Sequence, residues 1–272
     1  MKEEQKTLLR KQLSPDSLVI AIDGPSGSGK STVAKELAFR HHLAYLDTGA
    51  IYRAAAWWAQ YQQVDLADTK AVAQVVENMP LQINLDPRQQ QFFCAGIDIT
   101  EAIRTPELTR VVSQVSSNLA VRAILKAKQR QLIEAESGVF GSTSAASGAV
   151  GNDDAGNNSA PYAQGRGIVA EGRDITTEVA PDAPVRVLLT ASEAARLRRR
   201  ALEVRGSIDA ENLAATRAGV VNRDRKDSKV TKFLQAAPGV YSIDSSNLSV
   251  DEVVAEIEKL LPKGKNGGTK LS

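Results

Sequence analysis

The chain has 272 residues, of which 42 % are hydrophobic and 24 % are charged, and its net charge is +2. These values are ordinary for a globular protein, and so balanced a charge gives no support to nucleic-acid binding. No run of eighteen apolar residues occurs, so we expect neither a transmembrane helix nor a membrane partner. The single cysteine, Cys94, excludes an internal disulfide and favours a reducing, cytoplasmic compartment.

The first third of the chain alternates between strand and helix patterns. Residues 1–17 carry both charges without an apolar stretch, and we expect a flexible tail with no secretory signal. LVIAID (18–23) predicts a strand buried on both faces, and STVAKELAFRH (31–41) predicts a helix. A second strand at 43–47 and a second helix at 48–62 follow. This alternation predicts a parallel sheet with helical crossovers.

The middle of the chain has a different pattern. LQINLD (81–86) and QFFCAGIDIT (91–100) flank a PRQQ turn and predict a hairpin of two strands. Residues 106–136 predict one long helical region. The stretch 137–167 is rich in Gly, Ser, Ala and Asn, and such a composition buries too little apolar surface to fold, so we expect a mobile insertion.

The last third returns to the alternating pattern. We expect strands at 167–174, 185–191 and 239–244, a basic helix at 192–206, a further helix at 209–225 and an amphipathic helix at 249–261. Residues 262–272 are expected to form a second flexible tail. One folded domain, residues 18–261, lies between the two tails.

A phosphate-binding motif follows the first predicted strand. Residues 24–31 match G-x-x-x-x-G-K-[ST], in which small residues let backbone N–H groups point at phosphate oxygens. Lys30 adds a point charge for the β- and γ-phosphates, and the Ser31 hydroxyl is a ligand type that Mg²⁺ accepts. The pattern predicts ATP and Mg²⁺ binding by Gly24, Pro25, Ser26, Gly27, Ser28, Gly29, Lys30, Ser31 and Thr32.

Proteins with this motif either hydrolyse the nucleotide or transfer its γ-phosphoryl group. The N-K-x-D signature of a GTPase switch does not occur, and no apolar strand ends in the consecutive acids expected of a motor ATPase. A kinase needs cations around two anionic groups, and the arginines at 53, 173, 196–200 and 223 meet that need. These patterns favour phosphoryl transfer to a small anionic acceptor.

Several further motifs resemble those of the bacterial cytidylate kinases. They are DTGAIYR (47–53), EGRD (171–174), RLRRR (196–200) and NRDRKDS (222–228), and they occur in the family's order between about residues 18 and 261. The resemblance implies an α/β fold of the P-loop nucleoside-monophosphate kinase type. That fold has a parallel sheet flanked by helices, a hairpin-containing acceptor-binding insert at about 75–113, and an arginine-rich lid at about 195–209. The implied protein is a monomer that phosphorylates CMP and dCMP with ATP.

The same resemblance implies roles for individual residues. Ser113, Arg122 and Asp174 would surround the base, and these types complement the amino group and the two acceptors of cytosine. Arg53 and Arg173 would clamp the acceptor phosphate. Arg223 and Asp227 would lie near its phosphate and sugar, and Thr48 stands where the family has serine. With Lys30, the catalytic set would contain the lid residues Arg196, Arg199 and Arg200.

One departure from the family and several alternatives remain. Val230 stands where the family has an arginine, for which Lys229 or Lys232 would substitute, so weaker CMP binding or a changed acceptor range is expected. Thr48 and Ser113 would alternatively be packing or capping hydroxyls, and Asp174 or Asp227 a structural partner of an arginine. The rival functions are another P-loop small-molecule kinase, with a UMP or shikimate-type acceptor, and a non-catalytic ATP-binding module.

Overall fold

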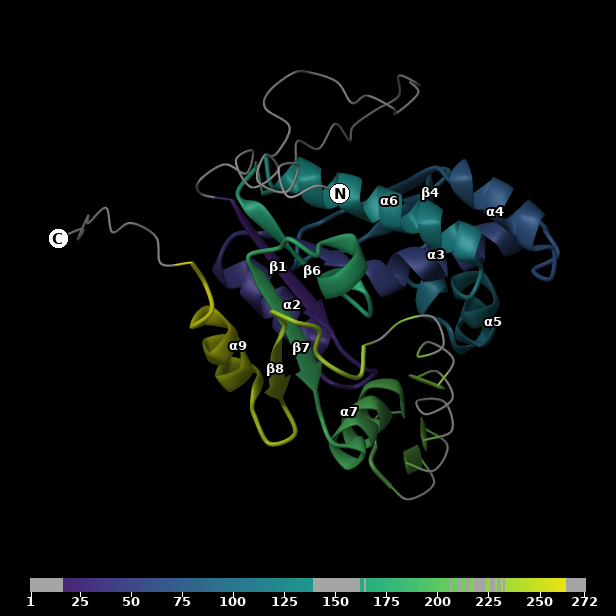
Figure 1. Ribbon diagram of the computed structural model, residues 1–272. Helices are drawn as coiled ribbons and strands as arrows, with labels where there is room; N and C mark the ends of the chain where they lie inside the picture. The colour runs from purple at the N-terminus through teal and green to yellow at the C-terminus, as the bar shows by residue number, and fades with distance from the viewer. Residues whose placement is uncertain are drawn as a thin grey trace.

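The computed structural model describes residues 17–138, 162–163, 165–205, 207–209, 212–213, 216–217, 224–225, 228, 231 and 233–262. Within these residues, five strands form a parallel sheet in the order β2-β6-β1-β7-β8 (Figure 1). The strands are β1 (Leu18–Asp23), β2 (Ala44–Asp47), β6 (Gly167–Gly172), β7 (Val185–Thr190) and β8 (Tyr241–Asp244). The predicted parallel sheet is therefore confirmed, and each strand lies within one or two residues of its expected range.

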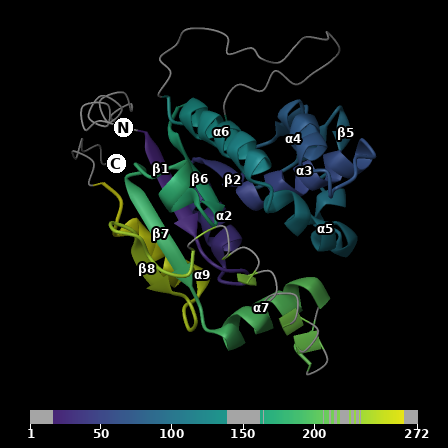
Figure 2. The same ribbon diagram turned by 45° about the vertical axis from the view of Figure 1, so that its right-hand side comes forward.

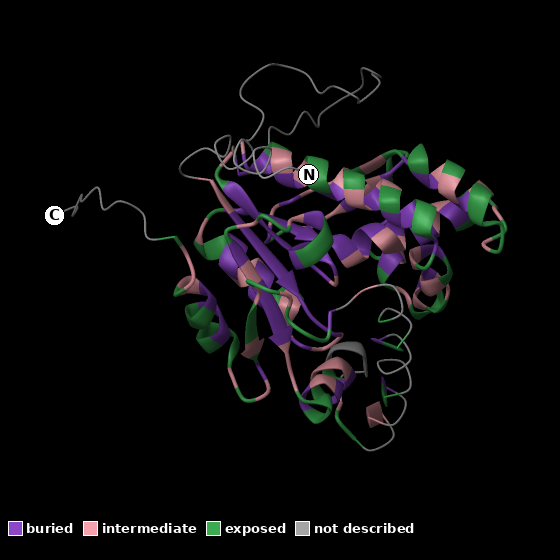
Figure 3. Ribbon diagram, in the orientation of Figure 1, coloured by how far each residue is buried: buried purple, intermediate pink, exposed green. Residues whose placement is uncertain are grey.

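Helices cover both faces of the sheet, and each face has its own hydrophobic core (Figure 2). Successive side chains of β1 point to opposite faces, so Ile20 and Ile22 pack with α2 (Lys30–Arg40) and α9 (Val250–Glu258). Val19 and Ala21 pack on the other face, together with residues of α3 (Thr48–Tyr61) and α6 (Leu119–Glu136). Burial on both faces explains the continuous apolar runs of the strands, which Figure 3 shows as the buried centre of the molecule.

A smaller unit lies beside α3 and contains α4 (Thr69–Glu77) and a three-stranded antiparallel sheet, as seen in the described residues. The sheet consists of β3 (Leu81–Ile83), β4 (Phe92–Cys94) and β5 (Ile97–Asp98). The prediction of a two-stranded hairpin is wrong in one respect, because 91–100 turns back on itself. Ala95 and Gly96 have φ of 51° and 76°, the left-handed pair that a tight two-residue hairpin turn requires.

The expected single helix at 106–136 is two helices, α5 (Pro106–Ser116) and α6. The break is at Asn118, whose side chain accepts hydrogen bonds from the N–H groups of Ala120 and Val121 at 3.0 and 3.4 Å. Asparagine is among the best residues for starting a helix in this way. Apolar residues recur at helical spacing on both sides of 117–118, so the periodicity alone predicts one continuous helix. It does not identify the capping residue at which a new helix begins.

After β6 the chain forms a short π-helix, η2 (Ile175–Val179), and after β7 the basic helix α7 (Glu193–Arg205). The basic helix and the C-terminal amphipathic helix are confirmed as predicted. Nearly all of the two predicted tails, most of the insertion at 137–167 and most of the helix expected at 209–225 lie outside the described residues. Among the residues that are described, no helix has both the length and the apolar character needed to cross a bilayer.

Candidate active site

The loop between β1 and α2 has a backbone that only glycine adopts without strain. Gly24 and Gly27 have φ of 155° and 78°. A Cβ on Gly24 would lie 2.1 Å from the carbonyl oxygen of Leu189, and one on Gly27 would lie 2.6 Å from that of Arg196. Both contacts are well below any tolerable distance, so the glycines let the loop pass close under β7 and α7. The loop therefore has the tight form that the phosphate-binding motif predicts.

A large cavity of about 1260 Å³ opens over this loop. Lys30 lines this cavity and donates from Nζ to the carbonyl oxygen of Pro25 at 3.0 Å. The cavity also extends to the start of α9, through Leu248 and Val250. The predicted residues that line it are Ser26, Gly27, Ser28, Gly29, Lys30, Ser31, Thr32, Arg53, Arg173, Arg199 and Arg200. The structure thus brings most of the predicted nucleotide-binding and catalytic residues together.

Two acids that open the DTGAIYR and EGRD motifs, but for which no role was predicted, lie beside this cavity. Asp47 ends β2, Glu171 lies one residue before the end of β6, and the two are register partners in adjacent parallel strands. The Ser31 hydroxyl donates to Glu171 Oε1 at 2.6 Å, and the Tyr45 hydroxyl donates to the same oxygen at 3.3 Å. A search for consecutive acids overlooks them, because the sheet and not the sequence makes them neighbours.

Burial raises the pKa of the Glu171 carboxyl above its usual value, and the charge of Asp47 raises it further. The charge of Lys30 and the hydrogen bond from Ser31 oppose that shift. A hydroxyl and a carboxylate 2.6 Å apart are the hard oxygen donors that Mg²⁺ prefers, so the residues present fit this ion. The described residues contain no group of three or more His, Cys, Asp or Glu side chains that could hold a metal ion.

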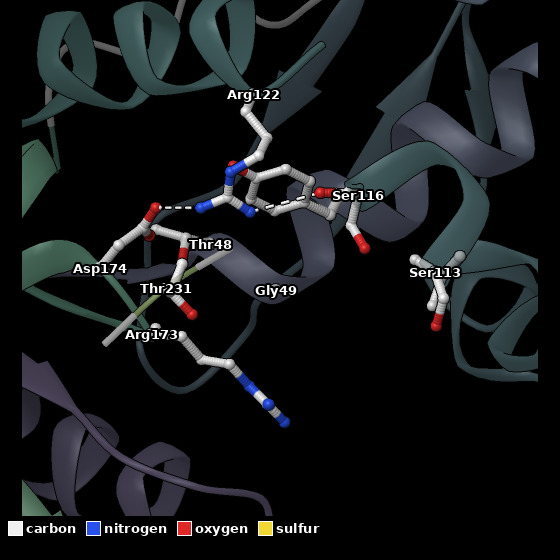
Figure 4. Close-up of a pocket in the computed structure, with 11 residues that line it drawn as sticks. Thr48, Gly49, Ser113, Ser116, Arg122, Arg173, Asp174 and Thr231 are labelled. Carbon is white, nitrogen blue, oxygen red and sulfur yellow. Dashed lines mark hydrogen bonds and ion pairs between the residues drawn. The ribbon is translucent and has the colours of Figure 1, made fainter. Parts of the chain in front are cut away.

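A second cavity, of about 70 Å³, lies between α3, α5, α6 and the end of β6. At its centre Arg122 Nη2 donates to Asp174 Oδ2 at 2.5 Å, and both side chains are less than a tenth exposed (Figure 4). Arg122 also donates to the carbonyl oxygen of Ser116 at 3.3 Å, and Lys126 Nζ lies 3.4 Å from Asp174. The lining residues are Thr48, Gly49, Tyr52, Val112, Ser113, Ser116, Arg122, Gly172, Arg173, Asp174 and Thr231.

The predicted base-binding residues therefore meet in one cavity. Arg122 and Asp174 are in direct contact there, whereas Ser113 lies on α5, away from that pair (Figure 4). The Thr48 hydroxyl donates to the carbonyl oxygen of Glu171 at 2.8 Å, so it ties α3 to β6 in addition to facing the cavity. That bond matches the packing alternative for Thr48.

The two arginines predicted to clamp the acceptor phosphate lie at the two cavities. Arg173 lines both of them, whereas Arg53 lines only the larger one beside the loop. Both predicted clamp arginines thus lie at the larger cavity, and Arg173 also reaches the smaller one. The predicted residues Arg223 and Asp227, and the unusual Val230 with Lys229 and Lys232, lie outside the described residues.

A further acid, Asp224, joins the loop to two of the arginines. Its carboxylate accepts from the Ser26 N–H at 3.3 Å and pairs with Arg196 at 2.5 Å and with Arg173 at 3.1 Å. Arg199 instead donates to the Ser245 hydroxyl and carbonyl oxygens, at 2.9 and 2.6 Å. A carboxylate therefore binds two of the arginines that were predicted to bind phosphate.

Known proteins match the chain along nearly its whole length. The family model described as cytidylate kinase matches residues 20–143 and 140–263. A cytidylate kinase of Lactiplantibacillus plantarum is 38 % identical over 254 residues, which cover 92 % of this chain and 97 % of that protein. One from Rhodococcus jostii is 38 % identical over 247 residues, with coverages of 90 % and 95 %. A bifunctional pantoate ligase/cytidylate kinase of Prochlorococcus marinus is 40 % identical over 242 residues, covering 87 % of this chain but only 43 % of that protein.

Proposed function

Because the chain belongs to the cytidylate kinase family, we propose that it transfers the γ-phosphoryl group of ATP to CMP or dCMP, forming ADP and CDP or dCDP. The observation that carries the proposal is the Arg122–Asp174 pair, which is buried in a cavity that shares Arg173 with the larger cavity over the loop. The two cavities thus adjoin at an arginine, and a phosphate on each side would meet there. The buried, unpaired Cys94 agrees with a reducing cytoplasm as the place of reaction.

The smaller cavity offers the complement of cytosine. In our proposal the Asp174 carboxylate accepts from the N4 amino group, and Arg122 donates to the N3 and O2 acceptors. Uracil has a carbonyl oxygen at position 4, which would face the carboxylate without a proton between them. A buried acceptor left unsatisfied costs about 1–3 kcal/mol, so we expect UMP to bind roughly ten- to hundredfold more weakly than CMP.

The larger cavity would hold ATP, with its phosphates over the loop N–H groups and Lys30. Ser31 and Glu171 would hold Mg²⁺, which neutralises charge on the β- and γ-phosphates when it is bound. Arg173 would bind the acceptor phosphate, and the arginines of α7 would meet the charge of the transferring group. No general base is needed, because the attacking group is already an anionic phosphate.

Two rearrangements accompany substrate binding in this proposal. The acceptor cavity of about 70 Å³ is smaller than ligand pockets usually are, so α5 must move away from Arg173 and Asp174 to admit a nucleotide. Asp224 must also release Arg173 and Arg196 before they bind phosphate. Bonds to the substrate phosphates then replace the bonds that the two arginines made to Asp224, so arginine charge is not exposed without a partner.

The test is ADP formation from MgATP, with CMP, dCMP, UMP, AMP, GMP and shikimate supplied separately. We expect fast turnover with CMP and dCMP only. Turnover with UMP at a similar rate would contradict the roles of Arg122 and Asp174. ATP binding without transfer to any acceptor would refute the enzyme assignment and favour a non-catalytic ATP-binding module.

A further inference from the structure

The N-terminus of η2 is capped by a residue that is distant in the sequence. Asp23, the last residue of β1, accepts from the Ile175 N–H at 2.9 Å and from the Thr176 N–H at 2.8 Å. Its carboxylate also accepts from the Thr176 hydroxyl at 2.6 Å. Asp23 pairs in the sheet with Gly172, so it lies beside the strand that ends at the acceptor cavity.

Because Asp23 caps η2, the side chain of the N-cap residue itself is left to make other contacts. Asp174 occupies the N-cap position of η2, and an aspartate there usually accepts from the N–H groups of the following turn. Asp174 makes no such bond. Its carboxylate points instead to Arg122 at 2.5 Å and to Lys126 at 3.4 Å. One of the two N–H groups that an N-cap side chain usually accepts from, that of Thr176, is already occupied by Asp23.

We propose that Asp23 is a positioning residue for base selection: by capping η2 from β1, it keeps the Asp174 carboxylate directed into the acceptor cavity. The proposal rests on the proposed function, in which Asp174 accepts from the cytosine amino group. Asp23 lines neither cavity and is only 2 % exposed, so it acts without touching a substrate. Without this cap, Asp174 has an alternative set of partners within its own turn, and the cavity loses its carboxylate.

The first variant is Asp23→Asn, which keeps the volume but places an amide donor against one of the N–H groups. We expect KM for CMP to rise about tenfold, the cost of one misdirected buried hydrogen bond, and the CMP-over-UMP ratio of kcat/KM to fall by a similar factor. KM for ATP and kcat at saturating CMP should stay within about twofold, since no phosphate contact is lost.

Glu136→Gln is the matched control, because Glu136 is a buried carboxylate that accepts from the N–H groups of Tyr162 and Ala163 and lines neither cavity. It should leave both KM values and the CMP-over-UMP ratio unchanged. Thr176→Val removes only the hydroxyl donor, so it tests the same cap if Asp23→Asn does not fold. We expect it to shift the ratio in the same direction by about threefold, a smaller effect because two donors remain.

A double-mutant cycle with Asp174→Asn separates the possible outcomes. If Asp23 acts through Asp174, adding Asp23→Asn to Asp174→Asn lowers the CMP-over-UMP ratio no further. Additive losses, or a rise of KM for ATP as large as that for CMP, would overturn the inference and show a general disturbance of the loop. If Asp174→Asn alone left the wild-type ratio unchanged, the proposed base contact would be wrong, and the positioning role would fall with it.

Discussion

The buried pair between Arg122 and Asp174 predicts a large loss of stability when the arginine alone is removed. The two side chains are 8 % and 5 % exposed, and Arg122 also donates to the Ser116 carbonyl oxygen and lies over the Tyr52 ring at 5.7 Å. In Arg122→Leu the Asp174 charge stays buried, and among the described residues Lys126, at 3.4 Å, is its remaining cationic partner.

Breaking a buried ion pair costs about 3–5 kcal/mol, and the remaining lysine places this variant at the lower end, about 3 kcal/mol. For a domain of this size that corresponds to a melting temperature lower by about 6–12 °C. Thermal unfolding and urea unfolding of the variant without nucleotide are the assays.

Two comparisons make the result decisive. Arg110→Leu removes an exposed arginine of α5 whose ion pair with Glu107 is 3.7 Å long, and such a pair contributes almost nothing to stability. The double variant Arg122→Leu/Asp174→Leu removes both charges and should recover part of the lost stability, because no buried charge remains unpaired. A melting temperature of Arg122→Leu within 2 °C of Arg110→Leu, on the scale of about 2–4 °C per kcal/mol, would refute this reasoning.

Three further outcomes are expected from other parts of the structure. Burial raises the pKa of Cys94 to about 11, so its thiol should react with a thiol reagent only after unfolding, and fast labelling of the native protein would contradict its burial. Gly27→Ala places a Cβ 2.6 Å from the Arg196 carbonyl oxygen at a positive φ, and the left-handed conformation alone costs about 1–2 kcal/mol. We expect KM for ATP to rise at least about tenfold, whereas an unchanged KM would show that the loop adapts. Burial raises the pKa of Glu136, so the folded protein holds this proton to higher pH than the unfolded chain does. The stability of the wild type relative to Glu136→Gln should therefore fall as pH rises from the usual 4.5 through the raised pKa, and a pH-independent difference in urea unfolding would exclude the shift.

Local patterns in the sequence predict much of this fold, because each buried strand is an apolar run and the phosphate-binding motif is a short contiguous segment. The break at Asn118 is missed, since helical periodicity continues through it. α4 is missed as well, although Asp68 caps it and Val72 and Val76 form its buried stripe. Nine residues with two buried valines are too short a pattern to distinguish from a loop.

The acids of the site are harder to predict, for a physical reason. Glu171 faces Ser31 and Asp23 caps η2 only because parallel strands place the end of one chain segment beside another. Asp224 is 198 residues from its partner Ser26. The spacing of residues in the sequence does not predict these long-range contacts. Arg122 and Asp174 are identified together only because the chain resembles a family in which the matching residues surround the base.

The measurement that tests the account most directly is the ratio of kcat/KM for CMP to that for UMP, in the wild type and in Asp174→Asn. We expect a strong preference for CMP in the wild type, which falls by about tenfold or more when the carboxylate becomes an amide. An equal preference in both proteins would contradict the central claim that the Arg122–Asp174 cavity recognises cytosine.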